Sequence, residues 1–196
     1  MEPGTARFEA FSDGVFAIAA TLLVLEFSAA PGSDLGTELL HLWPSYLAYA
    51  TSFLTIGIIW MNHNHTVSLL GRTDRTMLFI NILLLLTIAF LPFPTKLVAQ
   101  NLKGDGEQAA ALAYAATFVL MAALHLIWWG YARKDRRLIA NGTSESALRA
   151  VDRAYLPGVL MYGTVFVVAF FSPLAAVIIT FAIAAFYLPS AALFDR

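Results

Sequence analysis

Residues 7–26 form an apolar stretch long enough to cross a membrane, yet a carboxylate lies within it. The stretch reads RFEAFSDGVFAIAATLLVLE, with Asp13 about one and a half helical turns from its start. A bilayer core requires about 20 predominantly apolar residues in a helix. A charge near mid-membrane costs about 2.5–3.5 kcal/mol on insertion scales, so it usually faces a partner or water. We therefore predict a membrane helix that lines or contacts something other than lipid.

The composition places the whole chain in the membrane. Of the 196 residues, 59% are hydrophobic and only 13% are charged, whereas soluble domains carry about 25% charged residues. The predicted spans use most of the chain, so residues 1–196 are expected to form a single transmembrane domain. The sequence contains no cysteine, which excludes disulfides, thiol catalysis and thiolate metal sites.

Hydropathy and proline positions predict an all-α protein with six spans. The spans are expected at about 8–27, 44–62, 76–95, 109–131, 155–171 and 174–192. Pro92 and Pro94 are expected to fray the far end of the third helix. The last apolar region, from Tyr155 to Phe194, would be about 60 Å long as one helix, about twice the hydrocarbon thickness. Ser172-Pro173 divides it, because the residue before a proline disfavours helix. Five spans, with this region undivided, is the alternative.

The basic residues are distributed unequally between the two sides of the membrane. With six spans, ten of the twelve fall on the side that holds both termini: Arg7, Arg72, Arg75, Arg133, Lys134, Arg136, Arg137, Arg149, Arg153 and Arg196. Only Lys96 and Lys103 fall on the opposite side. By the positive-inside rule, both termini are predicted to be cytoplasmic in a multi-pass protein of the cell membrane.

The first predicted helix has two distinct faces. At about 100° per residue, one face carries apolar side chains at alternating steps of four and three: Phe11, Val15, Ile18, Leu22 and Leu25. Thr21 lies at the margin of this face, Asp13 and Glu9 lie opposite, and Ser12 lies on a flank. Such a seam suits parallel helices that pack around a shared axis. It also suits lipid or a neighbouring helix, and the periodicity does not separate a gating apolar constriction from these.

Potential partners for the buried acid lie at the end of the second span. Trp60, Asn62 and His63 can each donate a hydrogen bond to a carboxylate, and Asn81 lies on the same side of the membrane. We expect these residues to form a structural network with Asp13, since buried polar groups stabilise a fold only when every member is satisfied.

Two functional alternatives compete with the structural one. His63 and His65 provide two of the ligands that a metal site needs, without a matched third. Asp13 and His63 can also be arranged to relay protons. His41 and His125 are isolated in the sequence and are interpreted as interfacial or packing residues.

Three short blocks, in order, carry a resemblance to a known family. They are Arg7-x-x-x-Phe11-Ser12-Asp13, Trp60-Met61-Asn62-His63 and Leu91-Pro92-Phe93-Pro94-Thr95. The sequence resembles bacterial members of the transmembrane protein 175 family, the organelle potassium channels and their prokaryotic relatives. The resemblance covers the whole chain and is strongest over residues 7–26 and 60–95. Family members often have adjacent histidines after the tryptophan, whereas Asn64 separates His63 from His65 here.

The resemblance implies an assembly and a pore. It implies a homotetramer in the lipid bilayer, because the chain contains one six-helix repeat, and it implies that the first helices line the central pore. On this sequence the pore positions are Ile18, Leu22 and Leu25, with Thr21 close by, and Ile18 forms the narrowest ring. The signature network that anchors the pore helix comprises Arg7, Phe11, Ser12, Asp13, Trp60, Asn62, His63 and Asn81.

The expected function is a potassium-permeable cation channel and not an enzyme. The Thr-Val-Gly-Tyr-Gly filter of ordinary potassium channels is missing from the sequence, so selectivity is expected to be modest. No cofactor and no nucleic-acid partner is expected; potassium is the transient occupant of the pore. A proton-conducting channel is one alternative, and a small membrane metalloenzyme using His63 and His65 is another.

Overall fold

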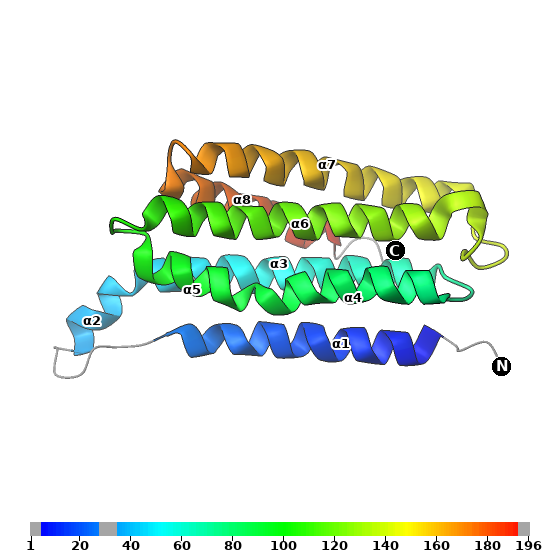
Figure 1. Ribbon diagram of the computed structural model, residues 1–196, viewed down its shortest axis with the longest axis horizontal. Coiled ribbons are helices and arrows are strands. Elements are labelled where there is room, and N and C mark those ends of the chain that lie inside the picture. Colours follow the sequence, from blue (N-terminus) through cyan, green and yellow to red (C-terminus); the bar gives the residue numbers. More distant parts are fainter. Residues whose placement is uncertain (1–4, 28–34, 192–196) are drawn as a thin grey trace.

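The apolar segments fold as helices in the computed structural model, which describes residues 5–27 and 35–191 (Figure 1). In chain order they are α1 (Thr5–Leu22) with a 3-10 turn η1 (Leu23–Glu26), α2 (Leu35–His41), α3 (Trp43–Ser68), α4 (Arg75–Phe90), α5 (Pro92–Asn101), α6 (Glu107–Arg133) with a 3-10 turn η2 (Lys134–Arg136), α7 (Glu145–Ala169) and α8 (Pro173–Ala191). The prediction of an all-α fold is confirmed.

Several of these helices are apolar enough to cross a membrane. By length and composition, three qualify among the described residues: Thr5–Leu25, Arg75–Asn101 and Glu107–Arg136. A fourth is formed if Leu35–His41 and Trp43–Ser68, which are bent by 50°, make one span. The apolar part of α8, Pro173–Leu188, is shorter. The fold is therefore that of a multi-pass membrane protein, and the count of six spans stays a prediction.

Prolines mark two breaks between helices, one expected from the sequence at Ser172-Pro173 and one not expected at Leu91. Between α7 and α8 the break at Ser172-Pro173 is confirmed, and the Ser172 hydroxyl accepts a hydrogen bond from the Ala175 N–H at 3.4 Å. The third span does not fray at Pro92 and Pro94, as the sequence suggested. The chain turns at Leu91 and continues as α5 to Asn101, because a proline at the first helical position sacrifices no hydrogen bond.

The helices run antiparallel, so successive connections alternate between the two ends of the bundle. Figure 1 shows the start of α1, the α3–α4 connection and the α6–α7 connection at one end. The other end holds α2, the α5–α6 connection and the α7–α8 connection. Every described basic residue except Lys96 and Lys103 therefore lies towards the first end. We call it the basic end. Arg196 lies outside the described residues.

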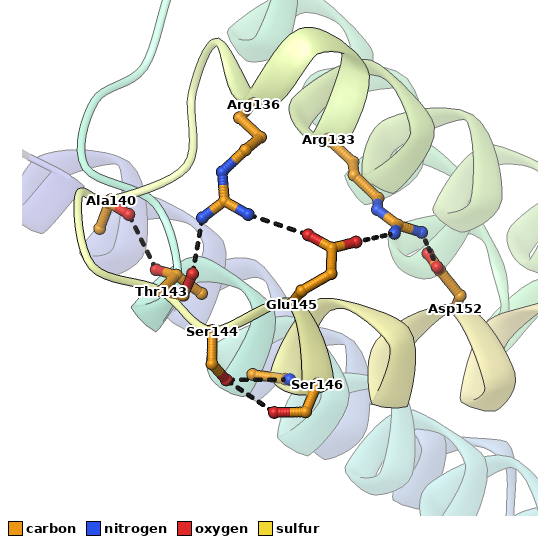
Figure 2. Close-up of polar contacts among 9 residues, drawn as sticks. Arg133, Arg136, Ala140, Thr143, Ser144, Glu145, Ser146 and Asp152 are labelled. Atoms are coloured by element: carbon orange, nitrogen blue, oxygen red, sulfur yellow. Dashed lines mark hydrogen bonds and ion pairs between the residues drawn. The ribbon is translucent and has the colours of Figure 1, made fainter.

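Ion pairs hold the α6–α7 connection at the basic end (Figure 2). Arg133 bridges Glu145 at 2.9 Å and also pairs with Asp152. Arg136 reaches the other oxygen of Glu145 at 3.0 Å and donates to the Thr143 carbonyl at 2.6 Å. These contacts fasten the start of α7 to the end of α6, because a single carboxylate accepts from two guanidinium groups.

A second set of contacts joins the two connections at the basic end. Backbone hydrogen bonds run from the Gly71 N–H to the Leu138 carbonyl and from the Ala140 N–H to the Leu69 carbonyl, each at 2.9 Å. Only glycine fits at position 71 without adjustment, because a Cβ atom there would lie 3.0 Å from the Ala140 Cα atom. The end of α3 is thereby held against the segment that follows η2.

The position of α1 in the bundle matters most for function. It packs against α3 and α4, with fewer contacts to α5, and Figure 1 shows it at an edge of the bundle. By contrast, α6 lies among α4, α5, α7 and α8 and carries some of the largest buried side chains: Tyr114, Phe118, Met121, Trp128 and Trp129. As a result, α1 has one buried face and one face that the rest of the described chain leaves uncovered.

Candidate functional site

The buried face of α1 is built from aromatic, small and hydroxyl side chains. Phe8, Ser12, Phe16 and Ala19 are buried in α1, and Leu23 continues the same face into η1. Phe16, Ala19 and Leu23 join the core that α3, α4 and α6 share. This face follows the helical period of three and four, so packing determines the rotation of α1 about its axis.

The opposite face of α1 is apolar and uncovered. Ile18 is 61% exposed and Leu25 is 70% exposed; Leu22, Thr21 and Phe11 are exposed as well. The Thr21 hydroxyl donates to the Ile18 carbonyl at 2.9 Å. A contiguous apolar surface of this kind in a membrane protein marks contact with lipid, with another helix or with a second subunit.

A buried chain of hydrogen bonds holds α1 to α3 and α4. Nε2 of His63 on α3 lies 2.9 Å from Oδ1 of Asn81 on α4. Nδ2 of Asn81 donates to Oγ of Ser12 on α1 at 3.0 Å, and the Ser12 hydroxyl donates to the Phe8 carbonyl at 3.0 Å. Because the amide oxygen of Asn81 accepts, Nε2 of His63 is the protonated nitrogen. Each side chain in the chain has a partner, which is the condition under which buried polar groups stabilise a fold.

Aromatic rings enclose the imidazole of His63. The Phe8 ring stacks at a centroid distance of 5.9 Å, Phe16 lies at 5.5 Å and Trp128 lies at 5.1 Å. His63 is 1% exposed. Its protonated nitrogen is bound by Asn81, so the ring serves the packing of α1 and is not presented to solvent.

Of the donors expected for Asp13 from the sequence, only Trp60 is bonded to it. Its Oδ1 atom accepts a hydrogen bond from Nε1 of Trp60 at 2.8 Å, and Asp13 is only half-buried. Neither His63 nor Asn81 hydrogen-bonds to it. Ser12 faces Asn81 instead. Asp13, the next residue, points about 100° further around the helix and therefore away from Asn81. Asp13 borders a groove of about 340 Å³ between α1 and α3, and small residues such as Ala17 and Gly57 are part of its lining.

Three further residues of the expected network do not join this chain of bonds. The Arg7 side chain is exposed and makes no hydrogen bond or ion pair within residues 5–27 and 35–191. Phe11 lies on the uncovered face. Asn62 belongs to a separate set of hydrogen bonds: its backbone carbonyl accepts from Thr66 Oγ1 at 2.7 Å and from the Tyr155 hydroxyl at 3.0 Å.

A second polar cluster escaped the sequence analysis. The Ser52 hydroxyl lies 2.8 Å from Thr95 Oγ1 and 2.8 Å from the Tyr114 hydroxyl, and all three side chains are buried. The cluster ties α3, α5 and α6 together near the end opposite the basic end. Thr95 belongs to a block already singled out, Leu91 to Thr95, but nothing in the pattern pairs it with Ser52 or Tyr114.

The described residues contain no group of three or more histidines, cysteines or carboxylates that can hold a metal ion. His63 and His65 lie two positions apart on α3, so their side chains point about 200° apart around the helix. His63 is buried, whereas His65 is half-buried. The structure therefore does not bring these two imidazoles to one site.

Comparison with known proteins identifies the family. The family model described as the endosomal/lysosomal potassium channel TMEM175 matches residues 7–92. A potassium channel of Chamaesiphon minutus is 39% identical over 188 residues, which is 93% of this chain and 93% of that protein. The chain belongs to the TMEM175 family. This is an ion-channel family, so the prediction that the chain is not an enzyme is confirmed and the metalloenzyme alternative is wrong.

Other members of the TMEM175 family are also similar to the chain. A potassium channel of Streptomyces collinus is 40% identical over 174 residues, covering 86% of this chain and 84% of its own. The crystal structure of a lysosomal potassium-selective channel TMEM175 homolog from Chamaesiphon minutus superposes with a TM-score of 0.87 at 38% identity, covering 95% of this chain and 97% of that one. The endosomal/lysosomal proton channel TMEM175 of Danio rerio is 32% identical over 129 residues, covering 60% of this chain and 25% of its own.

Proposed function

We propose that this chain is a potassium-permeable cation channel of the cell membrane, in which four copies assemble with their α1 helices around a central pore. The observation that carries the proposal is the contrast between the two faces of α1. One face is fixed to the subunit through Phe16, Leu23 and the Ser12–Asn81 hydrogen bond. The other face, with Ile18 and Leu25, is apolar and uncovered. A fourfold bundle of α1 helices would cover that face.

In such a tetramer the uncovered side chains form rings along the pore. Ile18, Leu22 and Leu25 contribute three apolar rings, with Thr21 beside them, and Ile18 forms the narrowest ring. An apolar constriction gates by excluding water, so no charged filter is needed to close the pore. The hydroxyl of Thr21 donates to its own helix backbone, which leaves its oxygen lone pairs to meet a passing hydrated cation.

The anchoring network has a mechanical role in this proposal. The side chains of Ser12, Asn81 and His63 hold α1 at a fixed rotation, so that the apolar rings face the axis. Trp60 and Asp13 support the same helix from the groove side. Arg7 and Phe11 belong to the signature and, being exposed on α1, are assigned to contacts between copies. Asn62 supports the network from within the chain, because its carbonyl accepts from the Tyr155 hydroxyl of α7.

The permeant ion is assigned from the relatives, and the orientation in the membrane is assigned from the distribution of basic residues. The relatives from Chamaesiphon minutus and Streptomyces collinus are potassium channels, and each covers most of this chain. The basic end faces the cytoplasm by the positive-inside rule, which makes both termini cytoplasmic.

Recordings from the purified protein in planar bilayers test the proposal. Ile18→Asn is expected to raise the single-channel conductance, because an amide ring holds water in the constriction. The matched control is Leu160→Asn on α7, where an equally uncovered leucine (71% exposed) lies away from α1. No potassium current from either the wild type or Ile18→Asn would refute the channel, and equal effects of the two substitutions would refute the pore position.

A proton-conducting channel is the second candidate. The relative from Danio rerio carries the name of a proton channel, and Asp13 is a half-buried carboxylate beside the groove of α1. The reversal potential under opposed potassium and pH gradients separates the two. A reversal potential near the potassium equilibrium supports the first candidate, and one that follows the pH gradient supports the second.

A further inference from the structure

One face of α7 is exposed along most of the helix and changes from basic to apolar. Arg149 and Arg153 are exposed on it near the start of the helix. Leu156 follows at 61% exposure, and Val167 continues the same face at 56% exposure. At about 100° per residue these four side chains lie within about 60° of one another around the helix axis. α7 packs mainly against α6 and α8, and Figure 1 shows it at the edge of the bundle opposite α1.

The two arginines of this face lack a counter-charge. Neither Arg149 nor Arg153 makes an ion pair or a side-chain hydrogen bond within the part of the chain that the structure describes. Glu145 and Asp152 lie within about one turn of Arg149, but both oxygens of each are bonded to other side chains, as Figure 2 shows for Glu145. Like charges four residues apart on a helix repel, so an anion from outside the chain would stabilise the pair.

The length of α7 places these arginines at the depth of lipid headgroups. From Arg153 to its end at Ala169 the helix is about 24 Å long, and the exposed Phe171 follows. The hydrocarbon core of a bilayer is about 30 Å thick, so a helix whose apolar part crosses it has Arg153 near the boundary of the core. Arg149 lies about one turn further out, among the headgroup phosphates.

We propose that this face of α7 is a binding site for an anionic phospholipid, whose phosphate lies between Arg149 and Arg153 and whose acyl chain lies along Leu156. Charge complementarity selects this occupant, because basic residues beside a membrane span attract anionic lipids. A guanidinium group also binds a phosphate through two parallel hydrogen bonds. A zwitterionic lipid would bring a positive headgroup to the same arginines, and a free phosphate would leave the apolar part of the face unused.

The chain offers two double variants that lose the same charge at different places. Arg149→Gln with Arg153→Gln removes both positive charges from the face of α7. Arg75→Gln with Lys134→Gln is the matched control, because it removes two positive charges from exposed positions of the basic end that lie outside α7. Neither Arg149 nor Arg153 has an ion-pair partner among the described residues, so the first double variant should melt at the wild-type temperature when no lipid is added.

The experiment follows thermal unfolding of the detergent-purified full chain during titration with dioctanoyl phosphatidylglycerol, dioctanoyl phosphatidylcholine and glycerol phosphate. Saturable stabilisation by phosphatidylglycerol alone is expected for the wild type and for the control. The affinity of the Arg149→Gln, Arg153→Gln variant for phosphatidylglycerol should fall by about 30-fold, the effect of two basic residues at an anionic headgroup. In the wild type, a photoreactive phosphatidylglycerol should label α7 near Leu156, and peptide mass spectrometry locates the label.

Four outcomes would overturn the site. Equal losses of affinity in the two double variants would assign the effect to the net charge of the basic end. Equal stabilisation by phosphatidylcholine would exclude recognition of the anionic headgroup, and saturable stabilisation by glycerol phosphate would indicate a site for a free anion. A smaller oligomer of Arg149→Gln, Arg153→Gln in size-exclusion chromatography would indicate that a second copy covers this face. None of these measurements uses an ion current, so their failure is distinguishable from failure of the proposed channel function.

Discussion

The amide nitrogen of Asn81 donates to the hydroxyl of Ser12 at 3.0 Å, and both side chains are buried between α1 and α4. Through the oxygen of the same amide, Asn81 also binds His63 on α3. One asparagine thereby fixes the rotation of α1 against two other helices. Since the uncovered face of α1 is determined by that rotation, this contact positions Ile18 and Leu25 as well.

Ser12→Ala is expected to lower the free energy of unfolding of the protein by about 1–3 kcal/mol. The substitution leaves the Asn81 amide N–H buried without its acceptor, and an orphan donor costs its full desolvation. Thermal or denaturant unfolding in detergent measures the change. Ser68→Ala is the control, because that hydroxyl is exposed and bonds only within its own helix to the His65 carbonyl. Equal stability of the two variants would contradict the role of Ser12.

Asp13→Ala is expected to lower tetramer yield or thermal stability, with a smaller effect on unfolding than Ser12→Ala. Its carboxylate accepts from Trp60, but both side chains are partly exposed, so water or a lipid headgroup replaces part of the lost bond. Size-exclusion chromatography and melting curves provide the readout. Normal assembly with an unchanged current would argue against an anchoring role for Asp13.

Ser52→Ala should lower the free energy of unfolding more than Tyr114→Phe does. The phenylalanine variant removes one bond and leaves Ser52 paired with Thr95, so a cost of about 0.5–1.5 kcal/mol is expected. The alanine variant removes the shared partner of both Thr95 and Tyr114 and should cost more. Unfolding free energies of the two single variants and the double variant decide the order, and a double variant equal to the sum of the singles would argue against a coupled cluster.

The stability of the basic end should depend on pH through Asp74. This residue caps α4: one carboxylate oxygen accepts from the Met77 N–H at 2.8 Å, and the other accepts from the Tyr131 hydroxyl at 2.8 Å and from Arg137 at 3.1 Å. Partial burial raises the pKa of the Asp74 carboxyl, but these hydrogen bonds and the charge of Arg137 outweigh it and lower the pKa below its usual value.

A lowered pKa means that the folded state favours the carboxylate. Its stabilising contribution is therefore complete above the unfolded pKa, about 3.9, and is lost as the pH falls through the lower folded pKa. Asp74→Asn, which keeps a capping oxygen but loses the charge, should be less stable than the wild type at pH 5 and above. The difference should shrink below about pH 4. A difference independent of pH would exclude this carboxylate as its source.

Much of the fold was predictable because it depends on local pattern. Apolar stretches and prolines located the helices, and the break at Ser172-Pro173 fell where the proline rule predicts. The third span was misjudged at its end, since Pro92 and Pro94 occupy the first turn of a new helix and need no backbone donor there. The same residues that end one helix can begin another, and only the packing of α5 on α3 and α6 selects between the two.

For the site, the sequence by itself determined that α1 is a membrane helix with one apolar face, because a period of 3.6 residues assigns side chains to faces without reference to neighbours. It also determined which polar residues were candidates for the hydrogen-bond network that holds α1. Only the tertiary structure decided that Ser12, and not Asp13, bonds to Asn81, and through Asn81 is linked to His63. These residues differ by about 100° around the helix, and the rotation that separates them is set by how Phe16 and Leu23 pack into the core. Long-range packing of this kind has no signature in the local pattern of the chain.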